Sequence, residues 1–202
     1  MLRLVTSSLA LLLAFAVSSL AEAGLIDAEQ IVVTTARNPN PSVQIAEVQA
    51  FETGTGINVA ESANGGSASA TSETFGTVAA DVIDGNTNGS FGAGSTWHSG
   101  NELNAGVTID LLAATELDSV TIWGRTDCCQ DRQNDLTLQI FDGMGTLLFE
   151  QQNIDLQATA NQSLEIALPD TAPVPEPASI AIWSLIGFVL AGFGYYRVRH
   201  KK

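Results

Sequence analysis

Short segments in which apolar and polar residues alternate constrain this chain more than any other feature. The clearest is Leu136–Phe141, which the turn Asp142–Gly145 joins to a second segment at 146–150. A period of two is typical of a half-buried strand, and a Gly-containing turn between two such segments predicts a hairpin. With no convincing helix in between, the repeated pattern predicts an all-β sandwich. The other predicted strands are 30–36, 43–51, 107–111, 119–124 and 163–168, and the polar stretch 52–80 is predicted as a loop with at most one short strand near 57–60.

The first 23 residues have the pattern of a secretory signal peptide. Arg3 precedes an apolar run that ends in Ala21-Glu22-Ala23, a small-x-small cleavage sequence. A membrane anchor is the alternative reading, although the run is short for a span of roughly 20 residues. We therefore expect an exported protein.

Residues 174–202 combine a proline motif, an apolar run at 180–195 and a basic tail. A basic end is expected to stay cytoplasmic, so the run predicts a C-terminal transmembrane helix. The whole segment resembles the PEP-CTERM sorting signal of Gram-negative bacteria, with Pro175-Glu176-Pro177 as its motif. The resemblance implies a transient inner-membrane stage, cleavage by an exosortase, and secretion to the cell surface or the extracellular polysaccharide. A permanent membrane anchor is the alternative.

The part between these ends, residues 24–175, is strongly acidic. It has three arginines and no lysine against 20 Asp and Glu residues, which gives a net charge of −17. Nucleic acid and anionic lipid are therefore poor partners. A bound cation would relieve the repulsion between carboxylates, although an acidic surface is also compatible with solubility alone.

The only two cysteines of the chain, Cys128 and Cys129, are adjacent. Their Cα atoms lie about 3.8 Å apart across a trans peptide, below the roughly 4.4 to 6.8 Å usual for a disulfide, so a bond between them is strained. In an exported protein without other cysteines this bond is still the expected intramolecular outcome. A pair of free thiols and an intermolecular bridge are the alternatives. The disulfide could act as a redox switch or as a rigid apolar surface patch, and the residues alone favour neither role.

Polar residues around this pair have a specific spacing. His98 precedes Arg125 by 26 intervening residues, Asp127 follows after one residue, and Arg132 after four more. This spacing, with the cysteine pair inside the last gap, resembles the fucose-binding signature of the F-type lectins, or fucolectins. Within the same family resemblance, segment 80–86 is similar to an acidic turn and Ile109-Asp110-Leu111 to a central strand. The resemblance covers residues 30–152 and implies a jelly-roll, galactose-binding-like sandwich.

The resemblance also implies how a sugar is held. His98, Arg125 and Arg132 would donate hydrogen bonds to two neighbouring hydroxyls and the ring oxygen of α-L-fucose. Guanidinium suits this role because it is a planar donor group with a permanent charge. Asp127 would orient the arginines, and the Cys128–Cys129 pair would lie against an apolar edge of the sugar.

A structural calcium ion is the implied cofactor. In F-type lectins the acidic turn binds it together with a glutamate from the last strand, which usually reads like Leu-Ala-Glu-Val-x-Val, and no strand of that sequence follows Arg132 in this chain. A similar strand, Gln44–Phe51, instead precedes the domain, so we expect a circular permutation in which Glu47 meets the Asp84 loop. Oxygen ligands of this kind suit calcium better than zinc or magnesium. The alternative is a solvent-facing Glu47 and an ordinary turn. The expected ligands are the carboxylates of Glu47 and Asp84, the carbonyls of Ala46, Asp81 and Asn86, and Ser95.

These expectations combine into one layout: a signal peptide at 1–23, a lectin-like sandwich at 24–152, a trailing strand and spacer at 153–173, and the sorting signal at 174–202. The expected function is a non-enzymatic, calcium-stabilised lectin that binds fucosylated or related glycans of the extracellular polysaccharide. A structural matrix protein on the same scaffold, without sugar binding, is the alternative. An enzyme is the third class, but no carboxylate pair, Ser/His/Asp set or Cys-x-x-Cys motif supports one.

Overall fold

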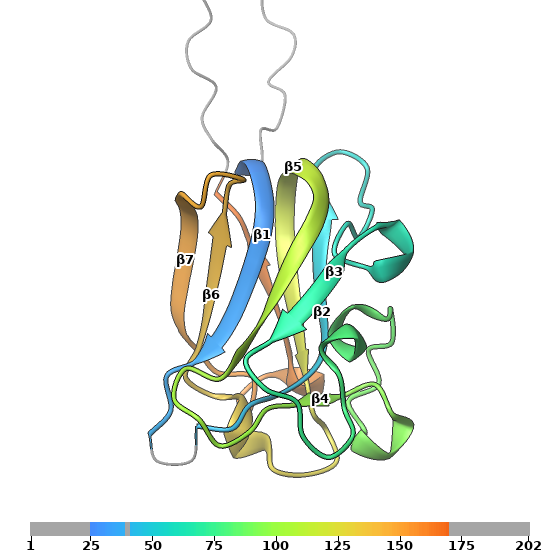
Figure 1. The fold of residues 1–202 in the computed structure, drawn as a ribbon, viewed down its shortest axis with the longest axis vertical. Coiled ribbons are helices and arrows are strands. Elements are labelled where there is room, and N and C mark those ends of the chain that lie inside the picture. Colours follow the sequence, from blue (N-terminus) through green and yellow to red (C-terminus); the bar gives the residue numbers. More distant parts are fainter. Residues whose placement is uncertain (1–24, 39–40, 170–202) are drawn as a thin grey trace, which may run out of the picture. The chain divides into compact units, whose positions relative to one another are not determined.

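The computed structural model describes residues 25–38 and 41–169, which are drawn in colour in Figure 1. Strands and short 3-10 turns make up all their regular structure, and no α-helix occurs among them. No helix in these two ranges is long and apolar enough to cross a membrane. The predicted signal peptide and the sorting signal with its apolar run at 180–195 lie outside the described residues. The elements are β1 (Leu25–Thr35), β2 (Gln44–Glu52), η1 (Ser62–Asn64), β3 (Ser67–Ala70), η2 (Ala79–Ile83), η3 (Phe91–Ala93), β4 (Trp97–His98), β5 (Gly106–Gly124), η4 (Gln130–Gln133), β6 (Leu136–Phe141), β7 (Leu147–Ile154), η5 (Ala160–Gln162) and β8 (Ser163–Ala167).

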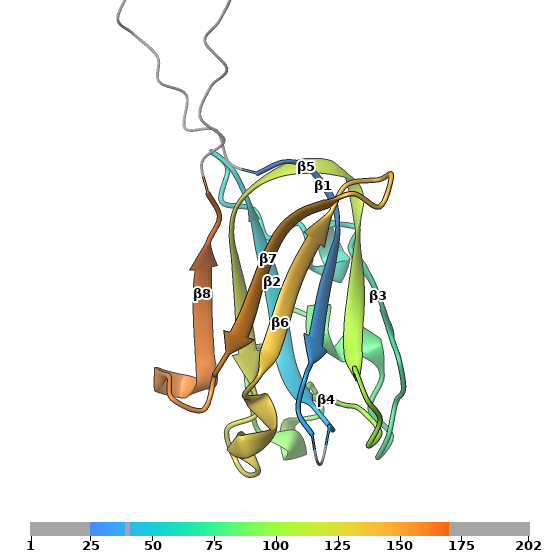
Figure 2. The same ribbon diagram turned by 90° about the vertical axis from the view of Figure 1, so that its left-hand side faces the viewer.

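Every strand pairing in this part of the chain is antiparallel. The first half of β5 pairs with β1 and β3, and β1 continues to β6 and β7. The second half of β5 pairs with β2 on one edge and β8 on the other, and β2 continues to β4. The 19-residue strand β5 arches over one end of the molecule and joins the two groups of strands, as Figure 2 shows. This arrangement is consistent with the predicted β-sandwich.

Alternation along the strands produces the core. In β6, Leu136, Leu138 and Ile140 are buried while the residues between them are partly exposed. In the second half of β5, Val120 and Ile122 are buried in the core, and Ser119 and Thr121 between and beside them are also buried. Each large aliphatic side chain removed from water contributes roughly 1.5 to 3 kcal/mol. Such contributions, and not local propensity, hold the two groups of strands together.

Three segments differ from the sequence-based prediction. The predicted segments 107–111 and 119–124 are two halves of one strand, β5. The short strand expected near 57–60 is wrong: that stretch contains an isolated bridge, and the strand lies at Ser67–Ala70 instead. The sequence pattern did not predict β3, because its residues are serine and alanine and only one of its faces contacts the core. The third difference is β8, which we predicted to trail the domain but which pairs with β5 over five residues. The folded unit therefore continues to at least Leu168, which is buried.

The loops that follow β3 and β5 lie at the same end of the molecule as β4 (Figure 1). Two contacts of Gly124 and Gln133 fix the loop after β5 in this position. Gly124 ends β5 so close to the next loop that a Cβ atom would lie 2.0 Å from the side-chain oxygen of Gln133. Gln133 is fully buried and its amide donates a 2.8 Å hydrogen bond to the carbonyl of Arg125. The β5–β6 loop, which carries the cysteine pair, is therefore closed by its own buried glutamine.

Candidate functional site

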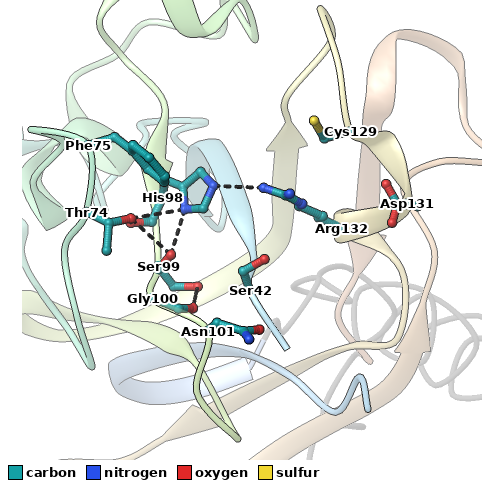
Figure 3. Close-up of a pocket in the computed structure, with 10 residues that line it drawn as sticks. All are labelled: Ser42, Thr74, Phe75, His98, Ser99, Gly100, Asn101, Cys129, Asp131 and Arg132. Atoms are coloured by element: carbon teal, nitrogen blue, oxygen red, sulfur yellow. Dashed lines mark hydrogen bonds between the residues drawn. The ribbon is translucent and has the colours of Figure 1, made fainter. Parts of the chain in front are cut away.

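A pocket of about 470 Å³ opens at this loop end of the molecule. Four segments far apart in sequence line it: the β1–β2 connection, the loop after β3, the β4 region, and the β5–β6 loop with η4. Figure 3 shows His98 and Arg132 facing each other across it. The lining residues are Ser42, Thr74, Phe75, His98, Ser99, Gly100, Asn101, Cys129, Asp131 and Arg132.

His98 is held in one tautomer. Its Nδ1 lies 2.6 Å from the carbonyl oxygen of Ser99, which only accepts hydrogen bonds, so Nδ1 carries the hydrogen. Nε2 therefore accepts a 3.0 Å hydrogen bond from Nη1 of Arg132. Burial lowers the pKa of His98, and the positive charges of Arg132 and Arg125 lower it further against the opposing effect of the Ser99 hydrogen bond. His98 is neutral at pH 7 and presents an acceptor to the pocket, not the donor that we predicted.

The cysteine pair forms a disulfide bond between its two adjacent residues. Cys129 lines the pocket and has a positive φ of 57° immediately before η4. Its carbonyl oxygen accepts a 3.0 Å hydrogen bond from the backbone N–H of Arg132. The disulfide-bonded turn therefore sets the start of η4, and η4 directs Arg132 toward His98.

Arg125 lies beside the pocket and is not among its lining residues. Its Nε donates a short hydrogen bond to Asp127, and this contact keeps the pKa of the Asp127 carboxyl below its usual value. The guanidinium carbon lies 4.5 Å from the centre of the Phe91 ring, a cation–π contact. Phe91 in turn meets the His98 ring edge-on, with centroids 6.5 Å apart. Asp127 thus orients Arg125, whereas Arg132 is positioned by His98.

All positive side chains of the described ranges gather at this end. The third one, Arg37, forms a 3.1 Å ion pair with Asp131, an exposed residue that lines the pocket. The remainder of the described surface carries only acidic charges. Arg37 lies 88 residues from Arg125, so no local spacing in the sequence grouped it with the site.

Phe75 is the aromatic residue among the pocket residues that sequence reasoning missed. It is 75% exposed, its φ is +57°, and its ring meets that of His98 edge-on at a centroid distance of 4.7 Å. A lone aromatic residue before a glycine, within a polar loop, was the available signal. Trp97, the aromatic residue next to His98 in sequence, is fully buried and belongs to the core. Phe91 supports Arg125.

A second cluster lies on β2 and the loop after η2. Glu47 is fully buried, and its Oε1 accepts a 3.2 Å hydrogen bond from the backbone N–H of Gly85, whereas Oε2 has no partner. Burial, together with the charge of Asp84, raises the pKa of Glu47 to about 8. Burial also raises the pKa of Asp84. A buried carboxylate oxygen without a donor is costly unless a cation neutralises it.

The other predicted calcium ligands lie near these two carboxylates in different settings. Ala46 is the extra residue of a bulge in β2, opposite the step from Gly124 to Trp123. Ser95 is buried, and its hydroxyl lies 3.5 Å from the carbonyl oxygen of Asn86. The carboxylate of Asp81 accepts a hydrogen bond from Val78 at the start of η2. No group of three or more His, Cys, Asp or Glu side chains gathers into a metal cluster within 25–38 and 41–169. The orphaned Oε2 of Glu47 nevertheless fits an oxygen-liganded cation.

Comparisons with known proteins agree with the predicted sandwich. Residues 81–172 match the family model of the NedA-like, galactose-binding domain. The chain is also similar to a fucolectin from Anguilla anguilla, with 43% identity over 54 residues, or 27% of this chain. This match spans about a third of the fucolectin, 34% of its length. No solved structure matches the chain. The protein therefore carries a domain similar to galactose-binding domains, with a distant likeness to fucolectin over part of its length.

Proposed function

We propose that the pocket around His98 and Arg132 binds a neutral sugar, with α-L-fucose as the leading ligand. One observation carries this proposal: His98 of β4 lines the same pocket as Cys129 and Arg132 of the β5–β6 loop. The likeness to fucolectin over part of the chain supports it. The match to a galactose-binding domain supports carbohydrate binding more generally.

The polar groups of the pocket suit a hydroxyl ligand. Arg132 is a donor only, and Nε2 of His98 is an acceptor only in its observed tautomer. A sugar hydroxyl both accepts and donates, so it replaces their direct 3.0 Å hydrogen bond by accepting from Arg132 and donating to His98. Arg132 has further N–H groups for a neighbouring hydroxyl or the ring oxygen. The carboxylate of Asp131 is available as a second acceptor.

The apolar groups of the pocket suit the other side of the same sugar. Phe75 presents an exposed ring next to His98, and Cys129 lies beyond Arg132 (Figure 3). A deoxy sugar has both a polar edge and an apolar methyl group. We assign the polar edge to Arg132 and His98, and the apolar surface to Phe75 and the disulfide. Arg125 and Asp127 complete the proposed site through their charge and through Phe91.

Calcium is the proposed structural ion of this domain. Glu47 and Asp84 would bind it, with Ser95 and the carbonyls of Ala46, Asp81 and Asn86 completing the oxygen set. The ion would neutralise the buried carboxylate and fix the loop that leads to β4 and His98. Because Glu47 comes from β2, this proposal includes the circular permutation, in which an N-terminal strand supplies a ligand that usually follows the domain. The jelly-roll topology is part of the same proposal.

The proposed setting is the cell surface or extracellular polysaccharide of a Gram-negative bacterium. The signal-peptide pattern at 1–23 and the resemblance of 174–202 to a PEP-CTERM signal support export and processing by an exosortase. A fucose-containing exopolysaccharide would then be the ligand, and the protein would act without catalysis.

Titration calorimetry of the full-length protein with an α-L-fucoside, with calcium in excess, tests the sugar site. Arg132→Ala should weaken binding by roughly 10-fold or more, since a hydrogen bond from a charged donor contributes about 1.5 to 3 kcal/mol. Arg132→Lys is the matched control: it keeps the charge but loses the planar donor pair, so we expect only partial recovery. Fucoside affinity that is absent in the parent, or equal in all three proteins, would refute the proposal.

One observation favours a second candidate, a structural matrix protein. The pocket arginines already have partners in the protein: Arg125 binds Asp127, and Arg132 binds His98. A scaffold that has lost sugar binding would keep these contacts for stability. In that case calcium raises the melting temperature, while fucosides change neither the melting temperature nor the heat of mixing.

A further inference from the structure

A second groove, of about 560 Å³, lies on a sheet face away from the pocket described above. Its floor is the outer side of β2, the second half of β5, and β8. In the middle row, Gln49, Thr121 and Glu165 are direct cross-strand neighbours and all three line the groove. The residues beside them in sequence, including Val48, Val120 and Ile166, are buried in the core. The groove shares no residue with the His98 pocket.

An aromatic side chain is fixed on the floor of this groove. Trp123 is partly exposed, and its indole N–H donates a 3.1 Å hydrogen bond to the side-chain oxygen of Gln49. The bond holds the indole ring over the neighbouring strand before any ligand arrives. Phe51 lines the groove further along β2, opposite Ser119. Because Trp123 is opposite Glu47, the two aromatic positions are separated by roughly 13 Å along the strands.

The charge of the groove limits what it can bind. Glu165 and Asp118 supply carboxylates at its rim, and Gln49, Thr121 and Ser163 supply neutral polar groups. None of its lining residues is basic. Carboxylates accept hydrogen bonds from hydroxyls but repel anionic polymers. Aromatic surfaces separated by hydroxyl acceptors, over more than one sugar's length, fit an extended and uncharged chain.

We propose that this groove is a second carbohydrate-binding surface, which holds a segment of a neutral polysaccharide across Trp123. It does not depend on the proposed fucose site, because its residues come from the sheet and none of the arginines contributes. A protein with both sites would bind the end of one glycan in the loop pocket and the middle of another chain on the sheet. Such a protein would cross-link matrix polymers as a monomer.

Affinity electrophoresis of the full-length protein tests this proposal, in gels that contain a soluble mixed-linkage β-glucan, a galactomannan or polygalacturonate. We expect at least one of the two neutral polymers to retard the parent, and free fucose in excess not to reverse it. Trp123→Ala should weaken retardation by roughly tenfold, because stacking and burial of an aromatic surface are lost. Glu165→Ala, at an exposed position where the domain should stay folded, should weaken it by a smaller factor. Trp123→Phe keeps a ring and should retain part of the affinity.

Parallel fucoside titrations separate the two sites. Trp123→Ala should keep the parent's fucoside affinity, and Arg132→Ala should keep the parent's retardation by the neutral polymer. The proposal would be overturned if only polygalacturonate retarded the parent, or if no polymer did. It would also be overturned if the parent and the alanine variants of Trp123 and Glu165 were retarded equally. Sedimentation showing that the parent is a dimer and Trp123→Ala a monomer would overturn it too, because a second copy would then cover this face. If the parent does not bind fucosides, each of these outcomes can still be interpreted, because the electrophoresis does not depend on the fucose site.

Discussion

Replacing Glu47 by glutamine should make the metal-free protein more stable at alkaline pH. The side chain is fully buried, has one partnerless oxygen, and has a pKa raised from 4.5 to about 8 by burial and by the charge of Asp84. The folded state therefore holds this proton more tightly than the unfolded state. It follows that the contribution of Glu47 to the stability of the folded state is fully present below about pH 4.5 and is lost as the pH rises to about 8.

The size of this effect follows from the shift. At about 1.4 kcal/mol per pKa unit, ionisation of Glu47 costs at most about 5 kcal/mol at pH 8. The Asp84 loop is exposed, and water around it reduces the cost, so we expect roughly 2 to 3 kcal/mol. Glu47→Gln has nearly the same shape without the charge and should avoid this loss. Excess calcium should stabilise the parent at pH 8 and leave Glu47→Gln almost unchanged, since a ligand stabilises only the state that binds it.

Urea unfolding followed by circular dichroism, in chelator and in calcium at about pH 5 and about pH 8, measures all of these terms. Subtracting the variant from the parent removes the titration of other carboxyls. If the difference in stability between the parent and Glu47→Gln in chelator is the same at both pH values, then Glu47 is not a buried and uncompensated acid. If calcium stabilises both proteins equally, the ion binds elsewhere.

Three further outcomes are expected. Fucoside affinity should fall as the pH drops below about 6.5, and the contribution of His98 to stability should fall with it, because the pKa of His98 is lowered in the folded state and its protonation removes the acceptor for Arg132; this contribution is opposite in sign to that of Glu47, and fucoside titrations from about pH 7.5 to about pH 5 measure the affinity. Gly124→Ala should cost about 2 kcal/mol in thermal unfolding, because its methyl group overlaps the buried glutamine that closes the loop. Reductant should weaken fucoside binding by the parent but not by a double serine variant of Cys128 and Cys129, which should bind weakly throughout; equal sensitivity of both proteins would show that the disulfide has no role in the site.

Strand pattern was the part of the fold most accessible from sequence. Segments 43–51 and Leu136–Phe141 coincide with β2 and β6 to within a residue or so, because apolar and polar residues alternate clearly in both, although burial alternates only in β6 and the first five residues of β2 are all buried. Alternation does not show where a strand turns from one group of strands to another, so β5 was predicted as two segments. A strand of serine and alanine such as β3 has too little apolar contrast to be recognised.

The candidate site was predicted as a set of residues but not as a hydrogen-bond network. Spacing grouped His98 with Arg132, and the structure places them 3.0 Å apart. The spacing could not show that the Ser99 carbonyl fixes the tautomer of His98, because the direction of that carbonyl depends on the folded backbone. The contributions of Arg37 and Phe75 depend on loops that converge only after the strands have paired.

Sequence by itself determined the class of secondary structure, the excess of acidic charge and the chemical types available for a site, because these depend on composition and on local periodicity. Tertiary structure alone decided that the arginines of the described ranges gather at one pocket, that Glu47 is buried against Gly85, and that Trp123 lies open on a sheet face. The reason is physical: burial, pKa and hydrogen-bond partners are properties of the neighbours that long-range strand pairing provides. In this chain most of those neighbours are dozens of residues away.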